Sequence, residues 1–340
     1  MNSILYGVNR SSFVLVLLLF WAASVHSQTF KLPTANQSLF NLQEQDQYFC
    51  PTIARTWESG TYGCVRSGGW QMHEGIDIRS IQRDKDGEST DPVLATANGT
   101  VVYINGKSSL SNYGNYIVIR HQIDGLEVYS LYAHLSRVRT GLKAGQNVKA
   151  GEAIALMGRT TNTREAISKE RAHLHFELNL FVNERFPIWH KKHFTGKNDH
   201  GLWNGQNLLG LDPRLALLAS HREGKDFNLV RWIQSGQELF RVQVRNTSFP
   251  WLKRYAALVE HTPSARGEIV GYELVMNYNG VPVKAIPLSD KEMKSRGKYH
   301  LISVNAAEYK KNPCRKLVTQ TKGKWNLGEN GLRLLDLLTH

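Results

Sequence analysis

The chain has 340 residues, of which 41% are hydrophobic and 10% are aromatic. This composition excludes an intrinsically disordered protein, and the length is sufficient for two domains. The formal net charge of +13 suits an anionic partner such as a cell wall or an outer surface, and it equally suits a protein that is simply soluble.

The N-terminus has the pattern of a cleaved export signal. An almost wholly apolar run from Phe13 to Ala23 is followed by small residues near Ser27. We therefore predict a signal peptide over residues 1–27 and a mature protein that is periplasmic or secreted. At that location we do not expect nucleic acid as a partner. This apolar run is shorter than the roughly 18 residues of a membrane span, so we expect no membrane span in the cleaved protein. The alternative is that the run stays uncleaved as an N-terminal anchor.

The three cysteines are interpreted through this export prediction. An oxidising compartment permits disulfides, and Cys50 and Cys64 are close enough in sequence to close a short loop. We predict that these two residues are bonded to each other. Cys314 then has no assigned partner.

Short alternating segments follow a polar lead-in segment at 28–49. Apolar and β-branched residues recur at 92–95, 99–104, 116–119, 128–132 and 152–157, with glycine turns at 143–145 and 149–151. This spacing predicts a mainly β, antiparallel core. Asp212 and Pro213 are typical of a helix N-cap and first turn, so a short helix should close a domain at 50–224.

A second, mainly β domain is predicted for residues 225–340. Residues 240–245 alternate, and two strand-like runs flank Asn279 and Gly280, a dipeptide that favours a type I′ hairpin turn. Residues 332–338 could form a final helix. The domain could bind the cell wall, bind another partner, cover a groove or simply support the structure, and its lysines and arginines favour the wall.

The stretch from Ala172 to Leu178 predicts a strand with two histidines on one face. Apolar and polar residues alternate along it, and side chains two positions apart project from the same face. His173 and His175 should therefore point the same way, with Leu174 and Phe176 on the opposite face. Two histidines alone are weak evidence for a site.

A second segment supplies the remaining candidate ligands. His73 and Asp77 are four residues apart, and the isoleucines around Asp77 favour an extended segment. Two imidazoles and one carboxylate, from His73, His175 and Asp77, suit one Zn²⁺ ion with a fourth position open to water, as in catalytic sites. The cysteines have no spacing typical of a structural zinc site.

Two further histidines could complete a hydrolytic site. A zinc hydrolase needs a base for the attacking water and a group that stabilises the oxyanion and protonates the leaving amine. His134 and His173 could share these roles, and the sequence does not divide them. The alternative is that both are merely structural.

The motifs HEGIDI, YGNYIVIRH, LYAHLS, VKAGEAIALMG and AHLHFEL, in this order, resemble the lysostaphin-type (LytM-like) zinc endopeptidases of bacterial cell walls. The resemblance covers about residues 60–213. It implies zinc ligands at His73, Asp77 and His175, a catalytic pair at His134 and His173, and an antiparallel β core with the metal in an open groove. The implied activity is hydrolysis of the peptide cross-bridges of peptidoglycan.

Three segments depart from the family pattern. Residues 79–90, 158–171 and 183–207 are long, and they should line the groove and affect substrate preference. We expect His190, His193 and His200 to lie in a solvated loop, although one of them could approach the zinc or the substrate. His121 is interpreted as structural.

Two alternative functions stay open. One is a non-catalytic module that binds the wall or activates an amidase; all five site residues argue against it. The other is a secreted endopeptidase that acts on glycine-rich proteins or on the walls of competitors.

Overall fold

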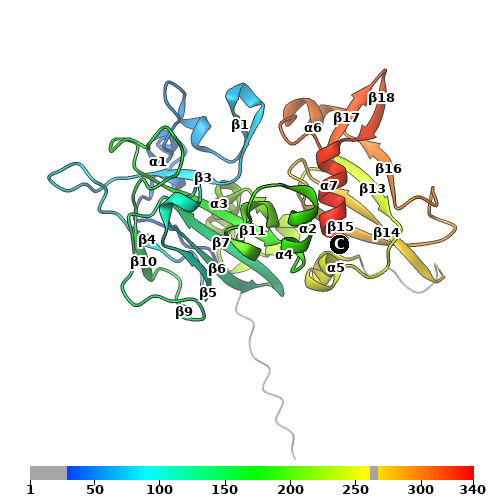
Figure 1. Ribbon diagram of the computed structural model, residues 1–340, viewed down its shortest axis with the longest axis horizontal. Helices are drawn as coiled ribbons and strands as arrows, with labels where there is room; N and C mark the ends of the chain where they lie inside the picture. The colour runs from blue at the N-terminus through cyan, green and yellow to red at the C-terminus, as the bar shows by residue number, and fades with distance from the viewer. Residues whose placement is uncertain (1–28, 261–266) are drawn as a thin grey trace, which may run out of the picture.

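The computed structural model describes residues 29–260 and 267–340, and it is mainly β with antiparallel sheets, as the sequence predicts (Figure 1). The predicted signal peptide lies outside the described residues. Within residues 29–260 and 267–340, none of the helices has both the length and the apolar character that a membrane span requires.

A seven-stranded antiparallel sheet carries the candidate site. Its strand order is β12-β11-β7-β6-β5-β9, and β3 also pairs with β11. The strands are β3 (Ile76–Arg79), β5 (Gly99–Asn105), β6 (Tyr116–Ile123), β7 (Leu126–Ala133), β9 (Asn147–Val148), β11 (His173–Phe181) and β12 (Leu208–Leu211). Every residue of β11 is buried, and this strand is paired with β3 and β12 along one edge and with β7 along the other.

Smaller elements surround this sheet. They are the hairpin of β1 (Gly63–Arg66) and β2 (Gln71–His73), a sheet of β4 (Pro92–Leu94), β10 (Ala153–Leu156) and β8 (Arg137–Val138), and the helices α1 (Gln45–Tyr48), α2 (Phe186–His193) and α3 (Pro213–Glu223). The predicted cap of α3 is confirmed, since the Asp212 side chain accepts a hydrogen bond from the backbone N–H of Leu215.

The C-terminal region forms a second antiparallel sheet of order β15-β14-β13-β16. Its elements are α4 (Leu229–Gln234), β13 (Phe240–Val244), α5 (Pro250–Arg254), β14 (Ile269–Met276), β15 (Pro282–Ser289), β16 (Tyr299–Val304), α6 (Ala306–Lys311), β17 (Val318–Thr321), β18 (Lys324–Leu327) and α7 (Glu329–Leu338). Short 3₁₀ turns occur at Ser38–Phe40, Trp57–Gly60, Ser67–Gly69, Ser108–Leu110, Gly201–Trp203, Gly205–Asn207, Gly224–Asp226 and Ala256–Leu258.

The hairpin predicted at Asn279 and Gly280 is present between β14 and β15, but the turn type was wrong. A type I′ turn needs positive φ at both central residues, whereas only Gly280 has positive φ here, at 90°. The side chain of Asn279 is instead buried, and its Nδ2 donates to Gly210 O at 2.8 Å. Local hydrogen bonds from the N–H groups of Asn279 and Val281 to Asn277 Oδ1, together with this contact to the main sheet, hold the loop in its conformation.

The two β regions share one continuous apolar core. Buried residues from Phe30, in the lead-in segment, to Leu338, at the end of α7, belong to the same cluster. Helix α7 lies against the segment that enters α2, where Asn183 Nδ2 donates to Leu337 O at 2.8 Å (Figure 1). The domain boundaries at residues 28, 50 and 225 stay predictions.

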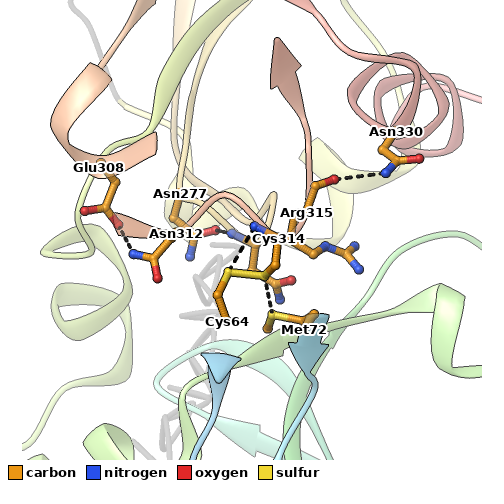
Figure 2. Close-up of a disulfide and its surroundings, with 9 residues drawn as sticks. Cys64, Met72, Asn277, Glu308, Asn312, Cys314, Arg315 and Asn330 are labelled. Carbon is orange, nitrogen blue, oxygen red and sulfur yellow. Dashed lines mark hydrogen bonds between the residues drawn. A yellow bond between two sulfur atoms is a disulfide. The ribbon is translucent and has the colours of Figure 1, made fainter. Parts of the chain in front are cut away.

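The predicted disulfide between Cys50 and Cys64 was wrong. Cys64 on β1 is bonded to Cys314, 250 residues away, as Figure 2 shows. Cys50 is free and buried. Its backbone N–H donates to Asp77 O at 2.8 Å, which holds it beside β3, and its Sγ lies 3.7 Å from Arg171 O. The fold thus separates the two sequence neighbours and brings the C-terminal region to Cys64.

Candidate metal centre

Strand pairing explains why residues distant in sequence meet at one site. His175 on β11 lies directly opposite Asp77 on β3, so their side chains project from the same face of the sheet. His73, at the end of β2, reaches the same point because Glu74 and Gly75 connect β2 to β3. The extended conformation predicted around Asp77 is therefore confirmed.

Gly75 allows the connection between β2 and β3 to approach β11 closely. A Cβ atom at this position would lie 2.3 Å from the backbone oxygen of Phe176. We expect Gly75→Ala to lower the free energy of unfolding by about 2–3 kcal/mol, because the backbone beside His73 and Asp77 must move. Denaturant unfolding measures this, with Gly106→Ala as the control, since a Cβ there meets nothing within 4 Å. Equal effects of both substitutions would contradict this account.

Three candidate ligand atoms converge. Asp77 Oδ1 lies 3.1 Å from His73 Nε2 and 3.0 Å from His175 Nδ1, and the two nitrogens are 3.2 Å apart. All three residues are buried, and together they form a group that could hold a metal ion. The roles of these residues as zinc ligands stay a prediction.

The surroundings of the cluster fit a metal ion. His73 Nδ1 donates to Thr61 O at 2.7 Å, so its Nε2 lone pair faces the cluster. His175 Nε2 lies 2.9 Å from Glu177 Oε1, so its Nδ1 faces Asp77. Histidine ligands of metals characteristically have the other ring nitrogen hydrogen-bonded to a carbonyl or carboxylate in this way. A donor set of two imidazoles and one carboxylate suits zinc.

Electrostatics make the cluster strongly attractive to cations. Burial alone would raise the pKa of Asp77, but the imidazoles of His73, His173 and His175 hold it well below its usual range, so the carboxylate is ionised. Burial alone would lower the pKa of His175, but Asp77 and Glu177 raise it to about 10. A proton or another cation therefore accompanies the buried carboxylates.

The predicted catalytic pair lies beside the cluster. The ring centroids of His134 and His173 are 4.8 Å apart, and that of His134 lies 5.9 Å from His175. His134 directly follows β7 and has φ 59°, a left-handed conformation uncommon for a non-glycine residue. The structure thus brings all five predicted site residues together, while the division of roles stays a prediction.

The tautomers of the pair follow from backbone contacts. His134 Nδ1 donates to Thr160 O at 2.8 Å, and His173 Nδ1 donates to Arg171 O at 2.7 Å. Burial lowers the pKa of both rings, that of His134 to about 3. Both imidazoles are therefore neutral at pH 7, and each has an Nε2 lone pair that can accept a proton.

A groove of about 880 Å³ contains the cluster. Its walls come from both β regions. The main sheet and its loops contribute Tyr113, His134, Asn162, Lys197, His200 and Gln206, among others, and the C-terminal region contributes Asn279, Arg315, Asn330, Arg333, Leu334 and Leu337. The C-terminal region therefore lines the groove, while its predicted role in binding the cell wall, binding another partner or covering the groove stays a prediction.

The long loops line the groove unequally. The 183–207 segment contributes several wall residues, and 158–171 contributes Asn162. The 79–90 segment instead contacts 158–171, where Arg159 pairs with Glu88 at 2.9 Å. Each loop therefore has to be considered separately as a determinant of substrate preference.

The solvated loop predicted for three histidines was wrong. His190 is buried on α2, and His193 Nε2 lies 3.1 Å from Asp336 Oδ2 on α7. His200 lines the groove, with its Nδ1 2.9 Å from Tyr103 Oη. His121 is buried between Asn98 O and Ser130 Oγ, which agrees with the structural role predicted for it.

Sequence reasoning missed three residues of the site. Glu177 accepts hydrogen bonds from Tyr113 Oη at 2.6 Å and Asn179 Nδ2 at 2.8 Å, which orients it toward His175. Its position two residues after His175 on the same strand face was a usable signal. Tyr113 begins the motif YGNYIVIRH but lies before the strand, and Arg66 ends a short edge strand, so neither had a strand-face position that indicated the site.

The fold and site define an antiparallel β protein with a buried His–Asp–His cluster that could hold a metal ion. The model of peptidase family M23 matches residues 71–186. Lipoprotein NlpD of Yersinia enterocolitica is 38% identical over 95 residues, which are 28% of this chain and 84% of that protein. The chain belongs to peptidase family M23, and the lysostaphin-type resemblance is confirmed.

Two further relatives show how much of the chain is shared. Murein hydrolase activator NlpD of Escherichia coli is 36% identical over 130 residues, 38% of this chain and 27% of that protein. The solved catalytic domain of lysostaphin from Staphylococcus simulans is 29% identical, covering 35% of this chain and 74% of that domain, with a TM-score of 0.25. The chain matches 33% of the length of a Pseudomonas aeruginosa NlpD/LppB homologue, so less than two thirds of such relatives is shared.

Proposed function

We propose that this protein is an exported zinc metalloendopeptidase that hydrolyses peptide cross-bridges of bacterial peptidoglycan. The observation that carries the proposal is the convergence of His73, Asp77 and His175 at a groove that His134 also lines, with the His173 ring packed against that of His134. Family membership supports a hydrolase, and the names of the NlpD relatives, which refer to murein hydrolases and lipoproteins, support an envelope location and a wall substrate.

The proposed mechanism assigns a task to each group. A zinc ion held by His73, Asp77 and His175 would supply Lewis-acid catalysis. His134 and His173, each with an unprotonated Nε2, can accept the proton of the attacking water and pass a proton to the leaving amine. His173 Nε2 lies 3.6 Å from Asp77 Oδ2, so an imidazolium formed there is stabilised by the carboxylate.

The charge of the groove supports this substrate class. Lys197, Arg315 and Arg333 in its walls can attract the carboxylates of peptidoglycan stem peptides.

Hydrolysis of purified cross-linked muropeptides tests the proposal. We expect the zinc-loaded protein to release new amino groups, chelation to stop the release, and His134→Ala or His173→Ala to lower the rate by about 10²–10⁴-fold while zinc content is kept. Hydrolysis that persists after complete removal of metal would overturn the proposal.

The alternative is a non-catalytic activator, which the name of the Escherichia coli relative favours. An activator would leave muropeptides intact and would increase the rate of a separate wall amidase. That result, obtained with folded and zinc-loaded wild-type protein, would replace the peptidase proposal.

A further inference from the structure

One arginine contacts the candidate ligand atoms directly. Arg66 ends β1, and its Nη2 lies 2.5 Å from Asp77 Oδ2 and 3.0 Å from His73 Nε2. Its side chain is only 14% exposed, so water screens the pair with Asp77 weakly. The guanidinium is permanently charged and can only donate hydrogen bonds.

The contact with His73 uses the lone pair that a metal ion would need. His73 Nδ1 donates to Thr61 O, so Nε2 is the nitrogen that is free to coordinate. A nitrogen that accepts a hydrogen bond from Arg66 cannot offer the same lone pair to an ion. A divalent ion seated among the three ligand atoms would also repel a guanidinium at this distance.

The position of Arg66 is fixed from the C-terminal region. Cys64, two residues earlier on the same short strand, is bonded to Cys314, and Cys314 Sγ lies 3.9 Å from Met72 Sδ on β2 (Figure 2). Gly63 packs so closely against Tyr278 that a Cβ there would lie 2.8 Å from its hydroxyl. The β1–β2 hairpin is thereby attached to the C-terminal region.

We propose that Arg66 sets the metal affinity of the site. Its guanidinium competes with the ion for His73 and Asp77, and metal binding requires Arg66 to withdraw from both. The disulfide keeps β1 in place and so favours the competing position. This inference rests on the proposed metal site and extends it to a residue that controls occupancy.

Zinc affinity of the full chain, measured by competition with a chromophoric chelator, tests this proposal. We expect Arg66→Gln to bind zinc at least tenfold more tightly than wild type. The matched control is Arg315→Gln, since Arg315 follows Cys314 and lines the same groove, while its Nε has no hydrogen-bond partner. Its affinity should stay within twofold of wild type.

Thermal unfolding gives a second readout. Without metal, Arg66→Gln should have a lower Tm than wild type, because Asp77 loses its guanidinium partner, and zinc should then raise its Tm by more than it raises that of wild type. Zinc affinity of Arg66→Gln that is unchanged, weaker or absent overturns the proposal, whether or not the wild type hydrolyses peptidoglycan. Tighter zinc binding without hydrolysis by any variant supports the role of Arg66 and counts against the peptidase.

Discussion

His175→Ala is expected to lose bound zinc and to lower muropeptide hydrolysis by more than ~100-fold. His175 Nδ1 is one of three converging donor atoms, and its Nε2 is oriented by Glu177 at 2.9 Å. The substitution leaves only His73 and Asp77, which are too few ligands for a tight zinc site. Zinc content by atomic absorption and initial rates on cross-linked muropeptides measure the two losses.

His200→Ala is the matched control for this experiment. His200 lines the same groove, but its ring nitrogens contact Tyr103 Oη and Leu110 O, at 2.9 and 3.2 Å. We expect this variant to keep one zinc ion per chain. Full zinc content in His175→Ala would show that the ligand set is wrong, since a true ligand cannot be removed without effect.

Removal of the Cys64–Cys314 disulfide is expected to be the most destabilising change outside the site. The bond closes a sequence separation of 250 residues, and in the chain-entropy account loops longer than 100 residues contribute roughly 5 kcal/mol. Cys64→Ala/Cys314→Ala should therefore lower the free energy of unfolding by about this amount. Denaturant unfolding at pH 7 without added metal measures the change.

Cys50→Ala is the control for the double variant, because it removes a buried sulfur without removing a disulfide. Cys50 is free and buried, so its replacement removes packing but no bond between the two regions. We expect a loss of about 1–2 kcal/mol. If the double variant is no less stable than Cys50→Ala, the disulfide contributes little. A folded double variant should also bind zinc more tightly than wild type, because β1 is released.

Local patterns made much of the fold predictable. Alternation over residues 172–178 predicted β11 and the shared face of His173 and His175, and the strands at β5, β6, β7 and β10 agree with their alternating segments. The predicted cap at Asp212 and the final helix also agree. Each of these features depends on residues that are close together in sequence, so the local pattern is sufficient to predict it.

The sequence alone determined the mainly β class and the family resemblance, and it proposed five candidate site residues that the structure brings together, because strand periodicity and motif spacing are local properties. Only the tertiary structure decided that Cys64 bonds Cys314, that Arg66 contacts Asp77, and that the C-terminal region forms a wall of the groove. These contacts join segments that have no shared sequence pattern. They exist because burial of one continuous apolar core brings the two sheets together. The spacing of the cysteines and the charge of a single arginine therefore could not predict which segments pack against each other.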